Sequence, residues 1–131
     1  MSTNNFLGTY LMSADSKDRV VLPVGIRNVI SRRHSGADAR DVQLYVTKTP
    51  DIRCGVTMWD SEPSEKTLDT VKLDRAYRLH VPFSVSDRSD LVVCLGCGDR
   101  FEMLSLKTYR EWQRRNQARV NAYLERLEFF S

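Results

Sequence analysis

The chain has 131 residues, of which 41% are hydrophobic and 28% are charged, and its formal net charge is +3 at pH 7. This composition predicts a globular protein, and the length predicts a single domain with a buried core. No apolar run is long enough for a membrane-spanning helix, and the N-terminal residues lack the features of a signal peptide. Three cysteines, an odd number, argue against the disulfide framework of a secreted protein, so we expect a cytoplasmic location.

The excess positive charge is concentrated near the end of the chain. Residues 1–105 contain 14 Lys or Arg and 14 Asp or Glu, whereas residues 106–131 contain six basic and three acidic residues. Mild basicity of this kind permits nucleic-acid binding without requiring it.

The first half of the chain predicts four short strands and one short helix. Pro23 ends the second strand because it has no N–H to donate, and it suits the first turn of a helix. Polar residues predict a loop and then a solvated acidic linker that contains Asp60, Glu62 and Glu65. The expected strands are 6–12, 19–22, 42–47 and 55–59, with a turn around 50–51, the helix at 24–30, the loop at 31–41 and the linker at 60–66.

The second half repeats this plan. Strands are expected at 70–73, 78–81, 90–95 and 100–104, with Pro82 ending the second of them and a short helix or turn at 83–87. So many short strands in a small domain predict a compact β-barrel, in which the two halves close one shared core.

A long amphipathic helix is predicted at 106–128, with Ser105 as its N-cap. Its apolar residues keep helical spacing, and Arg110, Arg114 and Arg115 fall largely outside the apolar stripe. We expect this helix to pack on the barrel or on another subunit with its basic face in solvent. Direct contact with DNA or a membrane is the alternative.

Two stretches of the sequence match each other, DSKDRVVLP at 15–23 and DRAYRLHVP at 74–82. Each has Asp-x-x-x-Arg, then apolar residues, then Pro. The matched residues are 59 positions apart and are the pairs Asp15 and Asp74, Arg19 and Arg78, and Pro23 and Pro82. Three matches in one register indicate an internal repeat. We therefore divide the single domain into a first repeat at 6–60, a second at 67–105 and the helix at 106–128.

These two boxes, together with FLGTY at 6–10, LYVT at 44–47 and VVCLGCGDRFEMLSLKTYREW at 92–112, resemble the MraZ family. This family is the two-repeat member of the AbrB/MazE/SpoVT group of transcription factors. Its first box carries a glycine at the position of Asp18, and Tyr77 stands at the matching position of the second box. The resemblance implies a mainly β fold of the α+β class, a swapped-hairpin, AbrB-like double-split β-barrel built from two ββαββ repeats.

The resemblance also implies a sequence-specific DNA-binding transcription regulator, which we expect to be a repressor. Such proteins bind short direct repeats in double-stranded DNA upstream of division and cell-wall genes, as homo-oligomers that form rings, and are associated with the nucleoid. The family's DNA contacts carry over to Lys17, Arg19 and Arg78, and Arg75 and Arg27 lie close to them. No cofactor, membrane or small-molecule substrate is implied.

The residue types of the boxes suit this role. The planar arginine fork pairs with guanine through two hydrogen bonds, a fixed Asp holds that fork in place, and Lys17 suits a phosphate. The alternative is that Asp15–Arg19 and Asp74–Arg78 are only intramolecular ion pairs that stabilise turns. Under both interpretations the two aspartates are structural.

Other chemistries find little support in the sequence. Cys94 and Cys97 form a lone C-x-x-C pair, for which only Cys54, His34 and His80 could add ligands, so we expect no metal site. No catalytic constellation is present, so we expect no enzyme. Two further functions stay open, a MazE-like antitoxin and an assembly module of the AbrB fold that does not bind DNA. The basic, helical tail disfavours the antitoxin, whose tail is usually acidic and disordered.

Overall fold

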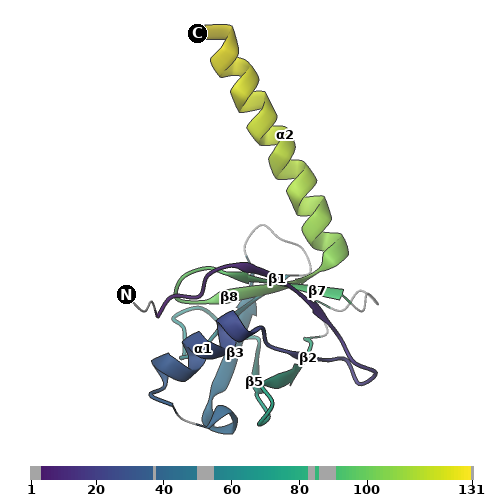
Figure 1. Ribbon diagram of the computed structural model, residues 1–131. Coiled ribbons are helices and arrows are strands. Elements are labelled where there is room, and N and C mark those ends of the chain that lie inside the picture. Colours follow the sequence, from purple (N-terminus) through teal and green to yellow (C-terminus); the bar gives the residue numbers. More distant parts are fainter. Residues whose placement is uncertain (1–3, 37, 50–54, 83–84, 86–90, 131) are drawn as a thin grey trace.

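The structure is a computed structural model that describes residues 4–36, 38–49, 55–82, 85 and 91–130, without the side chains of 123 and 127–130. The described chain is an α+β fold made mostly of antiparallel strands, as the sequence predicts (Figure 1). Its elements are β1 (Thr9–Ser13), β2 (Arg19–Val21), α1 (Val24–Arg33), a 3-10 turn η1 (Ala39–Asp41), β3 (Gln43–Lys48), β4 (Val56–Trp59), β5 (Asp69–Lys72), β6 (Arg78–His80), β7 (Leu91–Gly96), β8 (Phe101–Ser105) and α2 (Leu106–Phe130).

The strands form a six-stranded sheet and a separate two-stranded ribbon. The sheet has the order β1-β7-β8-β4-β3-β5, and the ribbon is β2-β6. The sheet order reads the same when the halves of the chain are exchanged, with β1 taking the place of β5, β3 of β7, and β4 of β8. Each half therefore lends one strand to the other, because β1 pairs with β7 and β5 pairs with β3.

The strand register has an approximate two-fold symmetry. In the ribbon, Val20 lies opposite Leu79, its own counterpart 59 residues later. In the sheet, Thr57 lies opposite Glu102 at the centre of the contact between β4 and β8. Counterpart strands therefore pair with each other at the centre of the ribbon and at the centre of the sheet. Neither half could form this arrangement alone.

The large sheet has a different partner on each face. Val92 and Cys94 of β7 belong to the main core, together with Val20 and Leu79 of the ribbon. Side chains alternate along a strand, and Val93 instead joins Leu104 in a small cluster with Leu106, Tyr109 and Trp112 of α2. The ribbon and α2 therefore pack on opposite faces of the β7–β8 part of the sheet, as Figure 1 also shows.

The expected closed barrel is not what the described strands form. The six-stranded sheet stays open, with β1 and β5 at its two edges. The second strands of the two repeats, β2 and β6, form their backbone hydrogen bonds with each other. They therefore do not extend the six-stranded sheet at either of its edges. The result is a ribbon laid over one face of a sheet.

Most element boundaries lie within one or two residues of the sequence prediction, and the start of β1 and the end of α1 differ from it more. The first strand was expected at 6–12, but β1 starts at Thr9, because Gly8 adopts a left-handed φ of +97° and Phe6 forms an isolated bridge to Gly98. The first helix was expected at 24–30, but α1 continues through Arg33, so the predicted loop begins later. The expected turn around 50–51 and the short helix or turn at 83–87 lie outside the described residues, apart from the buried Val85.

Asp60 is not the solvated acid that the sequence suggested. Its residue is only 5% exposed, and its carboxylate accepts hydrogen bonds from Arg33 Nε at 2.6 Å and Nη2 at 3.0 Å. His34 Nε2 lies 3.1 Å from the same carboxylate. A buried carboxylate needs such partners, and this ion pair holds the last turn of α1 against the end of β4.

The helix α2 begins as predicted and ends slightly later. Ser105 Oγ accepts a hydrogen bond from the Thr108 N–H at 3.1 Å, which is the N-cap interaction. Beyond its first turns the helix projects away from the body of the molecule (Figure 1), and Val120 and Leu124 are about half exposed. Among the described residues, no helix combines the length and the apolarity that crossing a membrane requires.

The ribbon's buried centre predicts a sharp contrast between two neighbouring positions. We expect Leu79→Ala to lower the free energy of unfolding by about 3 kcal/mol, because it leaves a cavity in a fully packed core. Val21→Ala, on the exposed face of the same ribbon, is the control and is expected to change it by less than about 0.5 kcal/mol. Urea unfolding followed by tryptophan fluorescence measures both, and equal losses would contradict the described orientation of the ribbon.

Candidate nucleic-acid interface

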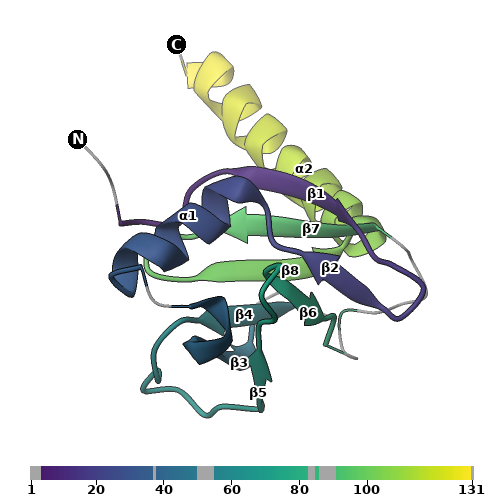
Figure 2. The same ribbon diagram turned by 60° about the horizontal axis from the view of Figure 1, so that its bottom comes forward.

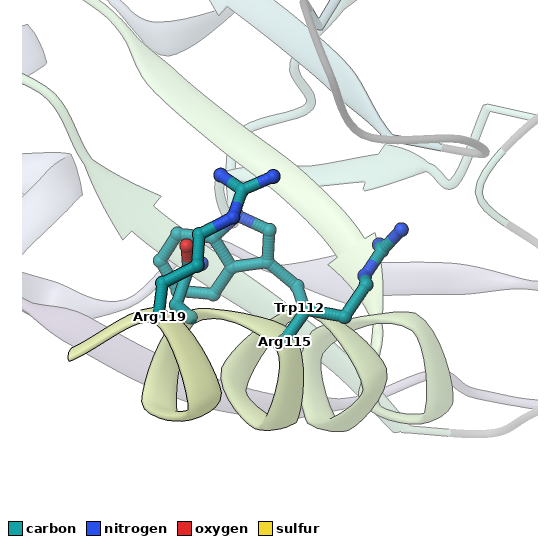
Figure 3. A pocket seen from close by; sticks show the side chains of 4 residues that line it. Trp112, Arg115 and Arg119 are labelled. Carbon is teal, nitrogen blue, oxygen red and sulfur yellow. The ribbon is translucent and has the colours of Figure 1, made fainter. Parts of the chain in front are cut away.

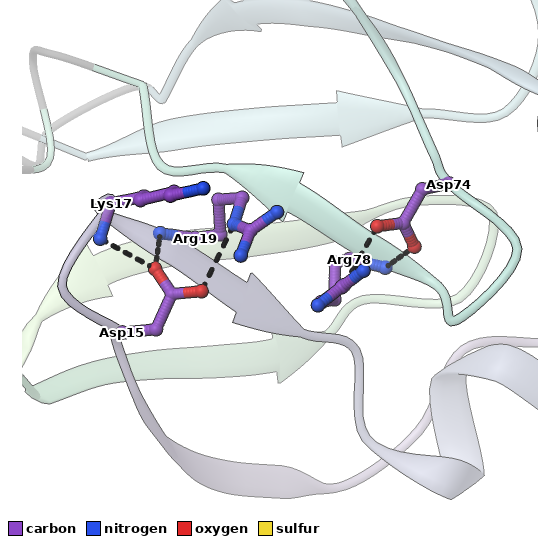
Figure 4. Close-up of polar contacts among 5 residues, drawn as sticks. All are labelled: Asp15, Lys17, Arg19, Asp74 and Arg78. Carbon is purple, nitrogen blue, oxygen red and sulfur yellow. Dashed lines mark hydrogen bonds and ion pairs between the residues drawn. The ribbon is translucent and has the colours of Figure 1, made fainter.

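The first Asp-x-x-x-Arg box is a turn closed by its own aspartate. The Oδ1 atom of Asp15 accepts hydrogen bonds from the backbone N–H groups of Lys17 and Arg19, each at 2.9 Å. Its Oδ2 atom accepts a bond from Arg19 Nε, also at 2.9 Å (Figure 4). One carboxylate therefore shapes the turn and holds the guanidinium that follows it.

The second box repeats this geometry. Asp74 Oδ1 accepts bonds from the N–H groups of Ala76 at 2.8 Å and Arg78 at 2.9 Å, and Oδ2 accepts one from Arg78 Nε at 2.7 Å. Each bond has its counterpart 59 residues earlier. The paired stretches of sequence are therefore also paired in local structure.

Each turn contains a residue in the left-handed region. Asp18 has φ of 56° and Tyr77 has φ of 58°. This conformation costs most L-residues about 1 kcal/mol or more, which explains why the resembled pattern has glycine at this position of the first box. The turns are also joined to the opposite half, since the Asp18 carbonyl accepts a bond from Val81 N–H and the Tyr77 carbonyl accepts one from Leu22 N–H, both at 2.9 Å.

Four side chains form the outward face of the β2–β6 ribbon. Residues opposite each other in an antiparallel pair share a face, and the register sets Arg19 opposite His80 and Val21 opposite Arg78. These four alternate with the buried Val20 and Leu79 and so lie on the other face of the ribbon. Figure 2 shows the ribbon as a whole, and Figure 4 shows Arg19 and Arg78 on it. We call this set, Arg19, Val21, Arg78 and His80, the ribbon face.

The aspartates bind only part of each guanidinium group of the two arginines on the ribbon face. The aspartates occupy only the Nε atoms, and among the described residues the structure gives no partner to the terminal nitrogens of Arg19 and Arg78. Their side chains are 25% and 40% exposed. Each guanidinium can therefore offer its terminal N–H groups to an acceptor outside the protein while the aspartate fixes its plane.

The aspartates stay charged under ordinary conditions. The backbone N–H of Arg19 lowers the pKa of Asp15, and the guanidinium of Arg19 lowers this pKa further. The backbone N–H and the guanidinium of Arg78 lower the pKa of Asp74 in the same way. A charged carboxylate keeps each arginine oriented near neutral pH.

The remaining predicted contact residues lie around the ribbon face rather than on it. Lys17 and Arg75 are exposed in the two turns, at opposite ends of the ribbon. Arg27 is half-buried on α1, with its Cζ atom 5.9 Å from the centre of the Tyr77 ring, and its buried Nε atom has no hydrogen-bond partner among the described residues. The structure thus brings Arg19 and Arg78 together, and Arg27 packs beside the second turn.

Pro23 and Pro82 occupy equivalent positions in the two repeats, and each accepts a hydrogen bond from the backbone N–H three residues later. The Pro23 carbonyl accepts a bond from Ile26 N–H at 3.0 Å, at the start of α1. The Pro82 carbonyl accepts one from Val85 N–H at 2.9 Å. Each proline follows its ribbon strand and turns the chain away from it.

Sequence reasoning missed Val21 and His80 as members of this face. His80 was considered only as a metal ligand, and Val21 only as an apolar strand residue. Because strand side chains alternate, a residue two positions after each arginine shares its face, and this signal was available in the sequence. The pairing of β2 with β6, which joins the two sets, was not.

A second basic surface lies on α2. Trp112, Arg115, Asn116 and Arg119 line a hollow of about 330 Å³, and Figure 3 shows the labelled side chains on one side of the helix. Since α2 and the ribbon pack on opposite faces of the sheet, this surface is separate from the ribbon face.

The cysteines do not form a reactive pair in the described part of the chain. Burial raises the pKa of the Cys94 thiol to about 12, and burial also raises the pKa of Cys97. Both thiols are therefore protonated near neutral pH. Within the ranges that the structure describes, no three His, Cys, Asp or Glu residues gather to hold a metal ion, and Cys54 lies outside those ranges.

Comparison of the sequence with models of known protein families finds no match, and comparison with curated proteins finds none either.

The lowered aspartate pKa values predict how stability depends on pH. A carboxylate with a lowered pKa in the folded state stabilises the protein above its unfolded pKa, about 3.9, and loses this contribution as pH falls through the folded value. We expect the double variant Asp15→Asn/Asp74→Asn to be less stable than wild type at pH 7 and the difference to shrink toward pH 2. Urea unfolding across this range measures it.

The control for this experiment is Glu62→Gln/Glu65→Gln, which changes the net charge equally in the exposed segment between the halves. Two results would refute the role of the two carboxylates. Either the difference in free energy of unfolding between wild type and the aspartate variant stays constant with pH, or the control variant shows the same pH-dependent difference.

Proposed function

We propose that this protein is a sequence-specific, double-stranded DNA-binding transcription regulator that inserts the ribbon face into the major groove. The observation that carries the proposal is the pair of arginines, Arg19 and Arg78, each held by an aspartate on the outward face of one two-stranded ribbon. The major groove of B-DNA is wide enough for such a ribbon, and an arginine fork pairs with guanine O6 and N7.

The aspartates make this arrangement better suited to recognition than free surface arginines. An arginine loses side-chain conformational entropy when it binds a base. Asp15 and Asp74 already restrict their arginines in the free protein, so less of this entropy is lost when DNA binds. Lys17 and Arg75 extend from the two ends of the ribbon, where phosphates border the groove. Base contacts from the centre and phosphate contacts from the ends are the usual division in protein–DNA interfaces.

The symmetry of the strands supports the resemblance to MraZ-like proteins. The sheet order that reads the same in both directions, and the pairing of β2 with β6, are what a swapped-hairpin, AbrB-like arrangement of two repeats would produce. We propose the finer features of that family for this chain as well. It acts as a nucleoid-associated repressor and binds short direct repeats upstream of division and cell-wall genes.

One ribbon offers few contacts, so affinity has to come from several copies. A homo-oligomer, such as a ring, that meets tandem sites gains affinity through multivalency without any new contact. The exposed apolar residues Val120 and Leu124 on the projecting helix favour a second candidate function, an assembly module that associates through α2 and does not bind DNA. The antitoxin interpretation has less support, because the tail is a continuous helix.

DNA binding is tested by selecting sites from randomised duplexes with the full chain and measuring affinity by fluorescence anisotropy across a salt series. We expect the selected duplex to bind more tightly than a scrambled one at each salt concentration. We expect Arg19→Ala and Arg78→Ala each to weaken binding to the selected duplex about 10- to 100-fold, because each removes one bidentate guanine contact. The losses on scrambled DNA are expected to be much smaller.

The matched control is Arg114→Ala on α2, which removes the same charge on the opposite face of the sheet and is expected to leave the selectivity unchanged. Equal binding of selected and scrambled duplexes that disappears at moderate salt would indicate only a nonspecific basic surface. Absence of any binding would refute the regulator and favour the assembly module.

The left-handed position of the first turn gives a second prediction. Asp18→Gly and Asp18→Ala both remove a negative charge beside Arg19, so we expect both to bind the selected duplex several-fold more tightly. Asp18 already bears the strain of φ 56°, which only glycine adopts freely, so the free energy of unfolding of Asp18→Gly is expected to exceed that of Asp18→Ala by about 1 kcal/mol. Anisotropy and urea unfolding together separate the two effects.

A further inference from the structure

We propose that Val21 and His80 make the two ends of the ribbon face read different bases, so that the protein recognises an asymmetric site. Val21 contacts a thymine methyl group, and His80 donates a hydrogen bond to a guanine. The inference rests on the proposed function, because it concerns which bases the ribbon reads.

The register places one of these residues at each end of the ribbon face. Val21 and His80 are counterparts in the repeat, 59 positions apart, and each lies opposite the arginine of the other half. One end therefore combines Arg78 with Val21, and the other end combines Arg19 with His80. The arginines are the same at both ends, so the difference in base preference comes from their neighbours.

Val21 is an apolar side chain on a face made otherwise of charged and polar groups. It is 46% exposed, whereas the residue before it in β2, Val20, is 1% exposed. An exposed valine beside a guanine-reading arginine can pack against the C5 methyl group of thymine, the only apolar group on the major-groove edge of a base pair. This end of the ribbon is therefore expected to prefer a guanine next to a thymine.

His80 is exposed at the equivalent position and presents an imidazole ring. A ring N–H donates to the guanine acceptors O6 and N7, and it has no apolar surface matched to a thymine methyl group. Together with the fork of Arg19, this end is expected to prefer two guanines. The approximate two-fold symmetry of the backbone therefore does not make the site a palindrome.

Exchanging the two side chains tests this inference with little disturbance elsewhere. Both residues are exposed, and the double variant Val21→His/His80→Val keeps the composition and the net charge of the chain. The probes are the duplex selected by the wild-type chain and two symmetrised duplexes, in which one half of the site is replaced by an inverted copy of the other half. One symmetrised duplex carries two thymine-containing halves, and the other carries two guanine-rich halves.

We expect the wild type to prefer the asymmetric duplex by about fivefold or more, the effect of one mismatched base pair. Val21→His is expected to prefer the guanine-rich symmetric duplex, and His80→Val the thymine-containing one. The double variant is expected to prefer the asymmetric duplex again, bound in the opposite direction. This recovery is a result that general damage to the fold would not produce.

Two results would overturn the inference while leaving the proposed function intact. Either the wild type binds all three duplexes equally, or the single variants keep the wild-type preference, while Arg19→Ala still abolishes selective binding. If the selection yields no preferred duplex and Arg19→Ala binds DNA as the wild type does, the proposed function itself has failed, and the inference fails with it.

Discussion

The pairing of β2 with β6 is the interaction on which the rest of the structure depends. It joins two segments 59 residues apart, with Val20 and Leu79 as a buried pair at its centre. Because these residues belong to the main core, the ribbon covers one face of the large sheet, while the exchanged strands β1 and β5 lie at its edges. The same pairing places two arginines on one exposed surface, so fold and candidate site have one origin.

The aspartate of each box links local structure with chemistry. Asp15 and Asp74 each close a turn through backbone N–H groups and hold an arginine through its Nε atom. The interpretation of these residues as ion pairs that stabilise turns and their interpretation as a DNA-binding box are therefore not exclusive. A carboxylate that uses its second oxygen only on Nε leaves the terminal nitrogens of the arginine available for the base contacts that we propose.

Much of the local structure could be predicted from the sequence because its causes lie within a few residues. The described strands were placed to within a few residues, the cap at Ser105 was identified, and Pro23 was placed at the start of a helix. Each depends on a side-chain period, a missing N–H or a hydroxyl near a helix start. The end of α1 and the burial of Asp60 were not predictable in this way, because Arg33 and Asp60 meet across 27 residues.

The sequence by itself determined the two boxes, their register of 59 residues and the residue types that suit DNA, since all of these are patterns along the chain. Only the tertiary structure decided that the sheet stays open, that Arg27 packs on Tyr77, and that the ribbon and α2 occupy opposite faces. It also brought Val21 and His80 onto the face of the arginines. Strand pairing over such distances depends on how the whole core is buried, and no local pattern specifies which strands will meet.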